Sequence, residues 1–277
     1  MARTRKDILA ASRKSRRKRI LIRSAILLFL FLGAIFSGVY FFLNMNALQI
    51  KEISIEGNNL VSAAELKDSV NNFLEGKYFW VFPKSNIFIF SKERMASEIL
   101  RSFPRAKEVK VGRKFFNGLS LKIAERSTLA LLCQKETCYF VDEDGIVFEN
   151  APYFSGNVYL TFFDERSGAE ASSSEAVSSN ALLGNSFLNK EEFKKLLDFS
   201  KLVSNSNINV GKIILKNEGV YELVTKDGWR ILLNEKNKTK EAYANMATAI
   251  STEIKDKTKK LDYIDLRFGN KVYFKYK

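Results

Sequence analysis

The chain has 277 residues, enough for about two domains of roughly 100–150 residues each. Its formal net charge of +14 would suit a nucleic-acid-binding protein, but residues 1–23 alone carry +9, so the basicity belongs to a tail and argues against that class. The sequence contains no histidine, which excludes Ser-His-Asp and Cys-His catalysis and removes the commonest metal ligand.

An uncharged stretch of twenty residues, 24–43, follows the basic tail. As an α-helix rising about 1.5 Å per residue it would span about 30 Å, the thickness of the hydrocarbon core of a bilayer. The alternative is a cleaved signal peptide, but its apolar core would be shorter, about 7–15 residues, and no small-residue cleavage site follows. We therefore expect a single transmembrane helix. Because the tail is basic, the positive-inside rule predicts a cytoplasmic N-terminus and an extracytoplasmic segment, 44–277.

Residues 48–126 are predicted to form a compact α+β module in the order β-α-α-β-β. Apolar alternation indicates a strand at 50–56, and Ser62 begins a capping box for the first helix. Helical spacing of apolar residues predicts the second helix near 92–102. An Asn117-Gly118 turn then joins the last two strands.

Residues 127–277 predict an antiparallel-rich β domain with helices on one face. A Ser- and Ala-rich segment, 164–186, is expected to be a flexible surface loop. Helices are expected after Asn189 and from Thr239 to about residue 255. The remaining apolar segments predict strands, the clearest of which are 210–216, 219–225, 229–233 and a closing hairpin within 261–276.

The two cysteines, Cys133 and Cys138, are separated by four residues. Two cysteines alone cannot complete a tetrahedral zinc site. Two interpretations remain: a disulfide across a hairpin loop in an oxidising compartment, or two small buried thiols.

No set of residues indicates catalysis. A glycosidase would need two carboxylates facing across a cleft, whereas Asp142 and Asp144 precede Gly145 in a sequence typical of a turn. Glycine-rich phosphate loops are also missing from the sequence. We therefore expect no enzymatic activity, no cofactor, no metal and no small-molecule substrate.

The order of these parts resembles the FtsQ/DivIB family of bacterial cell-division proteins. Short motifs along the chain carry the resemblance, namely 53–58, Glu125-Arg126, 141–148, Asp227-Gly228 and 264–268, the last reading Ile-Asp-Leu-Arg-Phe. Departures from the family pattern are Thr128, where the family usually has proline, Asn234, where a glycine is frequent, and the length of the Ser-rich loop.

The resemblance implies that residues 48–126 are a POTRA domain and residues 127–277 the β domain of a non-enzymatic divisome scaffold at the division septum. Such proteins bind FtsB/DivIC-like and FtsL-like membrane proteins outside the membrane, through the end of the β domain, and help to control septal peptidoglycan synthesis. The main alternative is a POTRA-bearing envelope-assembly or translocation factor that binds exported polypeptides. A membrane-anchored cell-wall enzyme is a third.

The register of the closing hairpin decides which of its side chains face the core. A two-residue loop, Gly269-Asn270, would pair Phe268 with Lys271 and set lysines among apolar residues. A three-residue loop pairs Phe268 with Val272 and leaves one face wholly apolar, so we predict this register. The remaining predicted pairs are Leu266 with Phe274, Ile264 with Tyr276, and, on a solvated face, Asp265 with Lys275 and Arg267 with Tyr273.

The last strand is aromatic, and as a sheet edge it would offer backbone groups without partners. Native edges are usually blunted by charge, proline or cover, and this strand has only lysines for that purpose. We therefore predict that a partner strand adds to it. The predicted partner-binding residues are Arg267, Phe268, Val272, Tyr273, Phe274 and Tyr276.

Overall fold

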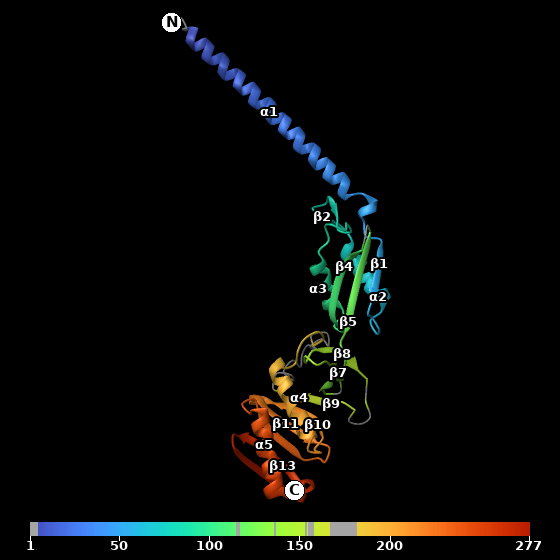
Figure 1. Ribbon diagram of the computed structural model, residues 1–277, viewed down its shortest axis with the longest axis vertical. Coiled ribbons are helices and arrows are strands. Elements are labelled where there is room, and N and C mark those ends of the chain that lie inside the picture. The colour runs from blue at the N-terminus through green and yellow to red at the C-terminus, as the bar shows by residue number, and fades with distance from the viewer. Residues whose placement is uncertain (1–4, 115–116, 136, 153, 155–157, 167–181) are drawn as a thin grey trace. The chain divides into compact units, whose positions relative to one another are not determined.

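The computed structural model describes residues 5–114, 117–135, 137–152, 154, 158–166 and 182–277 (Figure 1). Most of the predicted loop 164–186 therefore lies outside the described residues, whereas both residues of the predicted Asn117-Gly118 turn are described. The chain divides into two compact units. The first comprises Met1–Asn58, Ser62–Ile99 and Val109–Ile123, and the second comprises Asn59–Val61, Leu100–Glu108 and Ala124–Lys277.

Helix α1 (Arg5–Leu43) is continuous through the basic tail and the apolar segment. Its portion Leu21–Leu43 has 23 residues and a mean hydropathy of 2.5, so it is long and apolar enough to cross a membrane. None of that apolar surface is buried by the rest of the chain. The predicted segment 24–43 lies within this portion.

A three-stranded sheet in the order β1-β5-β4 forms the first folded module after α1. Strand β1 (Glu52–Glu56) is parallel to β5 (Gly118–Glu125), which lies beside β4 (Ala106–Lys114). Helices α2 (Ala63–Leu74) and α3 (Lys92–Ser102) bury apolar faces of Leu66, Val70, Leu74, Met95 and Ile99. The predicted β-α-α-β-β order is confirmed, with one addition. A short hairpin of β2 (Lys77–Tyr78) and β3 (Phe82–Pro83) lies between the helices.

The Ser62 cap is present as predicted, because the Ser62 hydroxyl accepts the backbone N–H of Glu65 at 3.4 Å.

Gly57 and Gly145 show why two of the family motifs contain glycine. Gly57 has a φ of +85°, and a Cβ there would lie 2.2 Å from the carbonyl oxygen of Ile123. Gly145 has a φ of +78°, and a Cβ there would press on Phe193 at 3.2 Å. Neither position accepts a side chain without strain.

A nine-stranded sheet in the order β14-β13-β12-β11-β10-β9-β6-β7-β8 forms the second unit. The neighbours β6/β9, β9/β10 and β12/β13 are parallel, and the others are antiparallel, so the antiparallel-rich prediction is confirmed. The strands are β6 (Ala130–Gln134), β7 (Thr137–Val141), β8 (Val147–Ala151), β9 (Leu160–Asp164), β10 (Val210–Lys216), β11 (Val220–Thr225), β12 (Arg230–Asn234), β13 (Leu261–Phe268) and β14 (Lys271–Tyr276).

Helices α4 (Lys190–Ser204) and α5 (Thr239–Ala249) share one buried core with the inward faces of these strands. The helical segment expected from Thr239 to about residue 255 is present, as α5 followed directly by a π-helix, Ile250–Ile254. Trp229 is only 1% exposed within this core. On the strands β6 and β7, Cys133 and Cys138 lie directly opposite one another and form a disulfide.

The family dipeptide Glu125-Arg126 stabilises two segments of the second unit, residues 59–61 and the turn at Asp142. The carboxylate of Glu125 accepts the backbone N–H groups of Asn59, Leu60 and Val61 at 2.6–3.0 Å. Burial opposes the charged form of Glu125, but these bonds and the charge of Arg105 outweigh it and lower the pKa below 4.5.

Arg126 forms an ion pair with Asp142, which is 1% exposed. The same carboxylate accepts the N–H groups of Asp144 and Ile146, both at 2.9 Å. Asp142 is therefore fully engaged in a turn, the interpretation that the sequence favoured over catalysis.

We expect Glu125→Gln to lower the free energy of unfolding at pH 7 and to flatten its dependence on acid pH. The folded pKa lies below the unfolded value of 4.5, so the charged form stabilises the fold fully above that pH. This stabilisation is lost as the pH falls through the folded pKa. Urea denaturation of the detergent-solubilised full chain, from about pH 7 to about pH 3, should show the difference between wild type and variant shrinking below pH 4.5.

Glu253→Gln, at an exposed glutamate, controls for loss of one negative charge. A difference between wild type and Glu125→Gln that stays constant over the whole pH range would contradict the role given to Glu125.

Candidate functional site

Strand β14 is the edge of the nine-stranded sheet. It pairs with β13 on one side, and no other strand in the described part of the chain lies along its opposite side. An edge of this kind exposes a row of backbone donors and acceptors to any extended chain that approaches it.

The register of the β13–β14 hairpin differs from the predicted one. Phe268 pairs with Lys271 across the two-residue turn Gly269-Asn270, which is the register that the apolar pattern disfavoured. The register then shifts between Phe268 and Asp265, so that Asp265 lies opposite Tyr273 rather than Lys275. The predicted pairs of this hairpin were therefore wrong.

The pairing of Asp265 with Arg267 explains this irregularity. The carboxylate of Asp265 accepts the Arg267 backbone N–H at 3.1 Å and two guanidinium N–H groups at 2.9 and 2.6 Å. This local bond to the backbone competes with the ladder between strands. It also allows Asp265 to be buried, at 5% exposed, instead of lying on a solvated face as predicted. The hydrogen bonds that the Arg267 guanidinium donates to Asp265 raise the pKa of Arg267, which stays charged.

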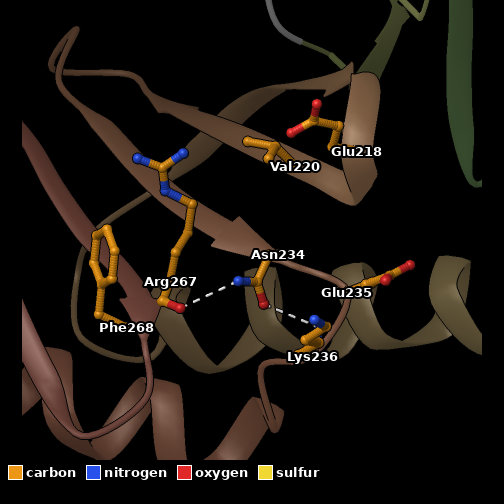
Figure 2. Close-up of a pocket in the computed structure, with 7 residues that line it drawn as sticks. All are labelled: Glu218, Val220, Asn234, Glu235, Lys236, Arg267 and Phe268. Carbon is orange, nitrogen blue, oxygen red and sulfur yellow. Dashed lines mark hydrogen bonds between the residues drawn. The ribbon is translucent and has the colours of Figure 1, made fainter.

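Two asparagines hold the end of β13 where its ladder with β12 stops. The Asn234 side chain donates to the carbonyl of Arg267 at 3.2 Å, as Figure 2 shows. The Asn237 side chain donates to the carbonyl of Leu266 at 2.7 Å. Asn234, a departure from the family's frequent glycine, thus supplies a hydrogen bond that glycine lacks.

Three of the predicted partner-binding residues form a group at the surface, which we call the hairpin cluster: the exposed Phe268 and Tyr273 and the half-buried Arg267. Phe268 and Tyr273 are 55% and 51% exposed, and their ring centroids lie 5.3 Å apart at a steep angle. The Arg267 guanidinium lies 5.8 Å from the centre of the Phe268 ring. The cluster presents apolar area and a positive charge side by side, the combination that is common at the energetic centres of protein interfaces.

The other three predicted residues, Val272, Phe274 and Tyr276, lie on the opposite face of β14. They are half-buried and pack against the core of the second unit. Their side chains serve the fold, and they contribute to the edge through the backbone and through the apolar area that remains uncovered.

A pocket of about 290 Å³ lies beside the hairpin cluster (Figure 2). Arg267 and Phe268 line it together with Glu218, Val220, Asn234, Glu235 and Lys236. The pocket residues from the β10–β11 and β12–α5 loops were not predicted from the sequence, because nothing in their local pattern shows that these loops meet the end of β13. The replacement of glycine by Asn234 was the one available signal.

The hairpin cluster offers a surface for recognition, and its one charged side chain, Arg267, forms an ion pair with Asp265. Among the described residues, no group of three or more His, Cys, Asp or Glu side chains could hold a metal ion.

We expect Arg267→Ala to lower the free energy of unfolding by about 1–3 kcal/mol, because it leaves the buried Asp265 carboxylate short of partners. Combining it with Asp265→Asn should recover part of the loss, since no charge then remains buried. Urea denaturation of the full chain measures both changes.

The chain contains a matched control in Asp164 and Arg166, which form the same pair at the end of β9. The Arg166 backbone and guanidinium donate to Asp164 at 2.6–3.3 Å. Arg166→Ala should therefore cost at least as much stability, because Arg166 also donates to the carbonyl of Phe187 at 3.0 Å. An Arg267→Ala variant as stable as wild type would contradict the assigned role.

Comparison with known proteins agrees with this architecture. Residues 48–126 match the family model of the FtsQ-type POTRA domain, and residues 130–267 match that of the C-terminal region of cell division protein FtsQ/DivIB. The chain is 26% identical over 162 residues to a cell division protein FtsQ of Streptomyces collinus, a match that covers 57% of this chain. The chain spans 56% of the length of that relative. The protein belongs to the FtsQ/DivIB family of membrane-anchored cell division proteins.

Proposed function

We propose that this protein is a divisome scaffold whose N-terminus is cytoplasmic and whose two folded units work outside the cytoplasm at the division septum. It binds small bitopic membrane proteins of the FtsB/DivIC and FtsL kinds and helps to control septal peptidoglycan synthesis. The FtsQ/DivIB family is a family of non-enzymatic division proteins, and family membership supports this role.

The open edge at β14 is the observation that carries the proposed binding mode. Each backbone hydrogen bond to an added strand nets about 0.5–1.5 kcal/mol, so several bonds together give useful affinity. The partner's inward side chains would extend the apolar surface of Val272, Phe274 and Tyr276. Its outward side chains would meet Tyr273 of the hairpin cluster.

Charge along the edge favours an acidic partner. Lys271 and Lys275 are exposed on β14, and Lys277 follows it directly. Arg267 adds no net charge here, because its guanidinium is paired with the Asp265 carboxylate. A partner segment with Asp or Glu next to its apolar residues would therefore bind with complementary charge.

A photo-crosslinking residue at Tyr273 should capture a small single-pass division protein from dividing cells. The same residue at Lys212, on β10 in the interior of the sheet order, is the matched control and should not capture it. Capture of exported polypeptides of many kinds at Tyr273 would instead support an envelope-assembly or translocation role.

We expect Tyr273→Ala to weaken binding of the captured partner at least about tenfold, which is about 1.4 kcal/mol, since it removes a central exposed ring. The control is Phe88→Ala, because Phe88 is a ring of the first unit with 63% exposure. Titration of purified full-length variants with the partner measures the change. If Tyr273→Ala binds the partner with unchanged affinity, the proposed binding mode is wrong.

The septal role is tested separately, by a fluorescent fusion of the full chain in dividing cells. A fusion that fails to concentrate at midcell would overturn that role.

Arg267→Ala should reduce partner binding as well as stability, while Arg166→Ala should reduce stability alone. Each variant breaks an Asp-x-Arg ion pair and loses stability for that reason. If only Arg267→Ala also loses affinity for the partner, the loss of affinity comes from the location of Arg267 in the hairpin cluster and not from reduced stability. Equal partner binding by both variants would remove Arg267 from the interface.

A further inference from the structure

The tip of the β2–β3 hairpin carries two of the most exposed rings in the described chain. Phe79 is 87% exposed and Trp80 is 94% exposed. Large adjacent apolar side chains on a surface mark a site of interaction with another molecule or with a membrane. The proposed binding at β14 does not involve this hairpin.

The backbone of the tip holds both residues in the left-handed region. Phe79 has a φ of 49° and Trp80 a φ of 65°, and the turn closes with a hydrogen bond from the Val81 N–H to the Tyr78 carbonyl at 3.1 Å. Glycine adopts this conformation without a penalty, whereas other residues are disfavoured by about 1–2 kcal/mol each. Phe79 and Trp80 therefore make this turn less stable than glycines would, so the stability of the turn does not explain their presence.

The hairpin is attached to the end of the membrane helix. Helix α1 contacts β3 and ends at Leu43, whose carbonyl accepts the Asn86 side-chain N–H at 2.8 Å and that of Gln49 at 3.3 Å. Asn86 is fully buried, and its own backbone N–H bonds to the carbonyl of Pro83 in β3 at 3.2 Å. Asn86 thus connects the hairpin by hydrogen bonds to the carbonyl of Leu43, the last residue of α1.

The tip is consequently within reach of the bilayer surface. Trp80 precedes Phe82 of β3 by two residues, so the two Cα atoms are at most about 7 Å apart. The headgroup region on each side of the hydrocarbon core is about 5–8 Å thick. Because α1 leaves the hydrocarbon near Leu43, a ring so close to its end can enter that region.

We propose that Phe79 and Trp80 insert into the headgroup interface of the membrane that α1 spans, beside the C-terminal end of α1. Tryptophan is favoured at this depth, and the tip extends the aromatic belt that Tyr40 and Phe41 begin on α1 itself. Lys77 in β2 and Lys84 directly after β3 provide charges for lipid phosphates. The membrane thereby holds the folded module that follows α1 at a second point, so that this module cannot swing freely about the end of α1.

Tryptophan fluorescence tests this proposal directly. The chain has two tryptophans, and the other one, Trp229, is 1% exposed within the core. The emission spectrum of the full chain is recorded in nanodiscs of phosphatidylethanolamine and phosphatidylglycerol. Subtracting the spectrum of the Trp80→Phe variant gives the fluorescence of Trp80 alone, the Trp80 component. We expect this component to be blue-shifted, strongly quenched by lipids brominated in the upper acyl chain, and poorly quenched by aqueous acrylamide.

The matched control is Asp68→Trp in the Trp80→Phe background, which moves the probe to the exposed surface of α2 in the same unit. It should respond to acrylamide and not to brominated lipid. Thermal melts confirm that each variant is folded. A Trp80 component that responds like the control would overturn the proposal and would leave the tip to solvent or to a protein partner.

Discussion

The pairing of β13 with β12 is the interaction on which the C-terminal site depends. Within the described part of the chain, strand β14 forms its backbone hydrogen bonds with β13 alone. Strand β13 in turn pairs with β12 over a short parallel stretch, in which Arg230 lies opposite Tyr263 and Leu232 lies opposite Asp265. Past Asp265 the side chains of Asn234 and Asn237 replace backbone donors. Loss of this pairing would release the last two strands together, and with them the whole hairpin cluster.

An aromatic edge strand carries a risk of self-association, and the charge pattern of β14 limits it. Antiparallel pairing of two copies through β14 would bring Lys271 and Lys275 of one copy near the same residues of the other, and like charges in such positions repel. An acidic strand meets no such repulsion. The lysines therefore reduce pairing between copies while leaving the edge open to a partner of opposite charge.

Elements with a strong local signal were predictable from the sequence. The Ser62 cap, the helix near 92–102 and the strand at 210–216 each follow from a periodicity or a capping residue that acts within a few positions. The β2–β3 hairpin could not be predicted, because its strands have only two residues each. Its turn also has Phe79 and Trp80 at positions of positive φ, where a glycine would have indicated a turn. The pocket residues were missed because they come from separate loops.

The register error shows why the site itself was only partly predictable. The apolar pattern assigned Val272, Phe274 and Tyr276 to the inner face correctly, but it assumed that a charged residue finds its partner across the strands. Asp265 instead finds a bidentate partner two residues along its own strand. The same device recurs in Asp164 and Arg166, so the Asp-x-Arg spacing is structural in both places. At β13 it also changes which side chains are exposed, because the shift in register turns Phe268 outward to meet Tyr273, whereas the regular register would have directed it to the core.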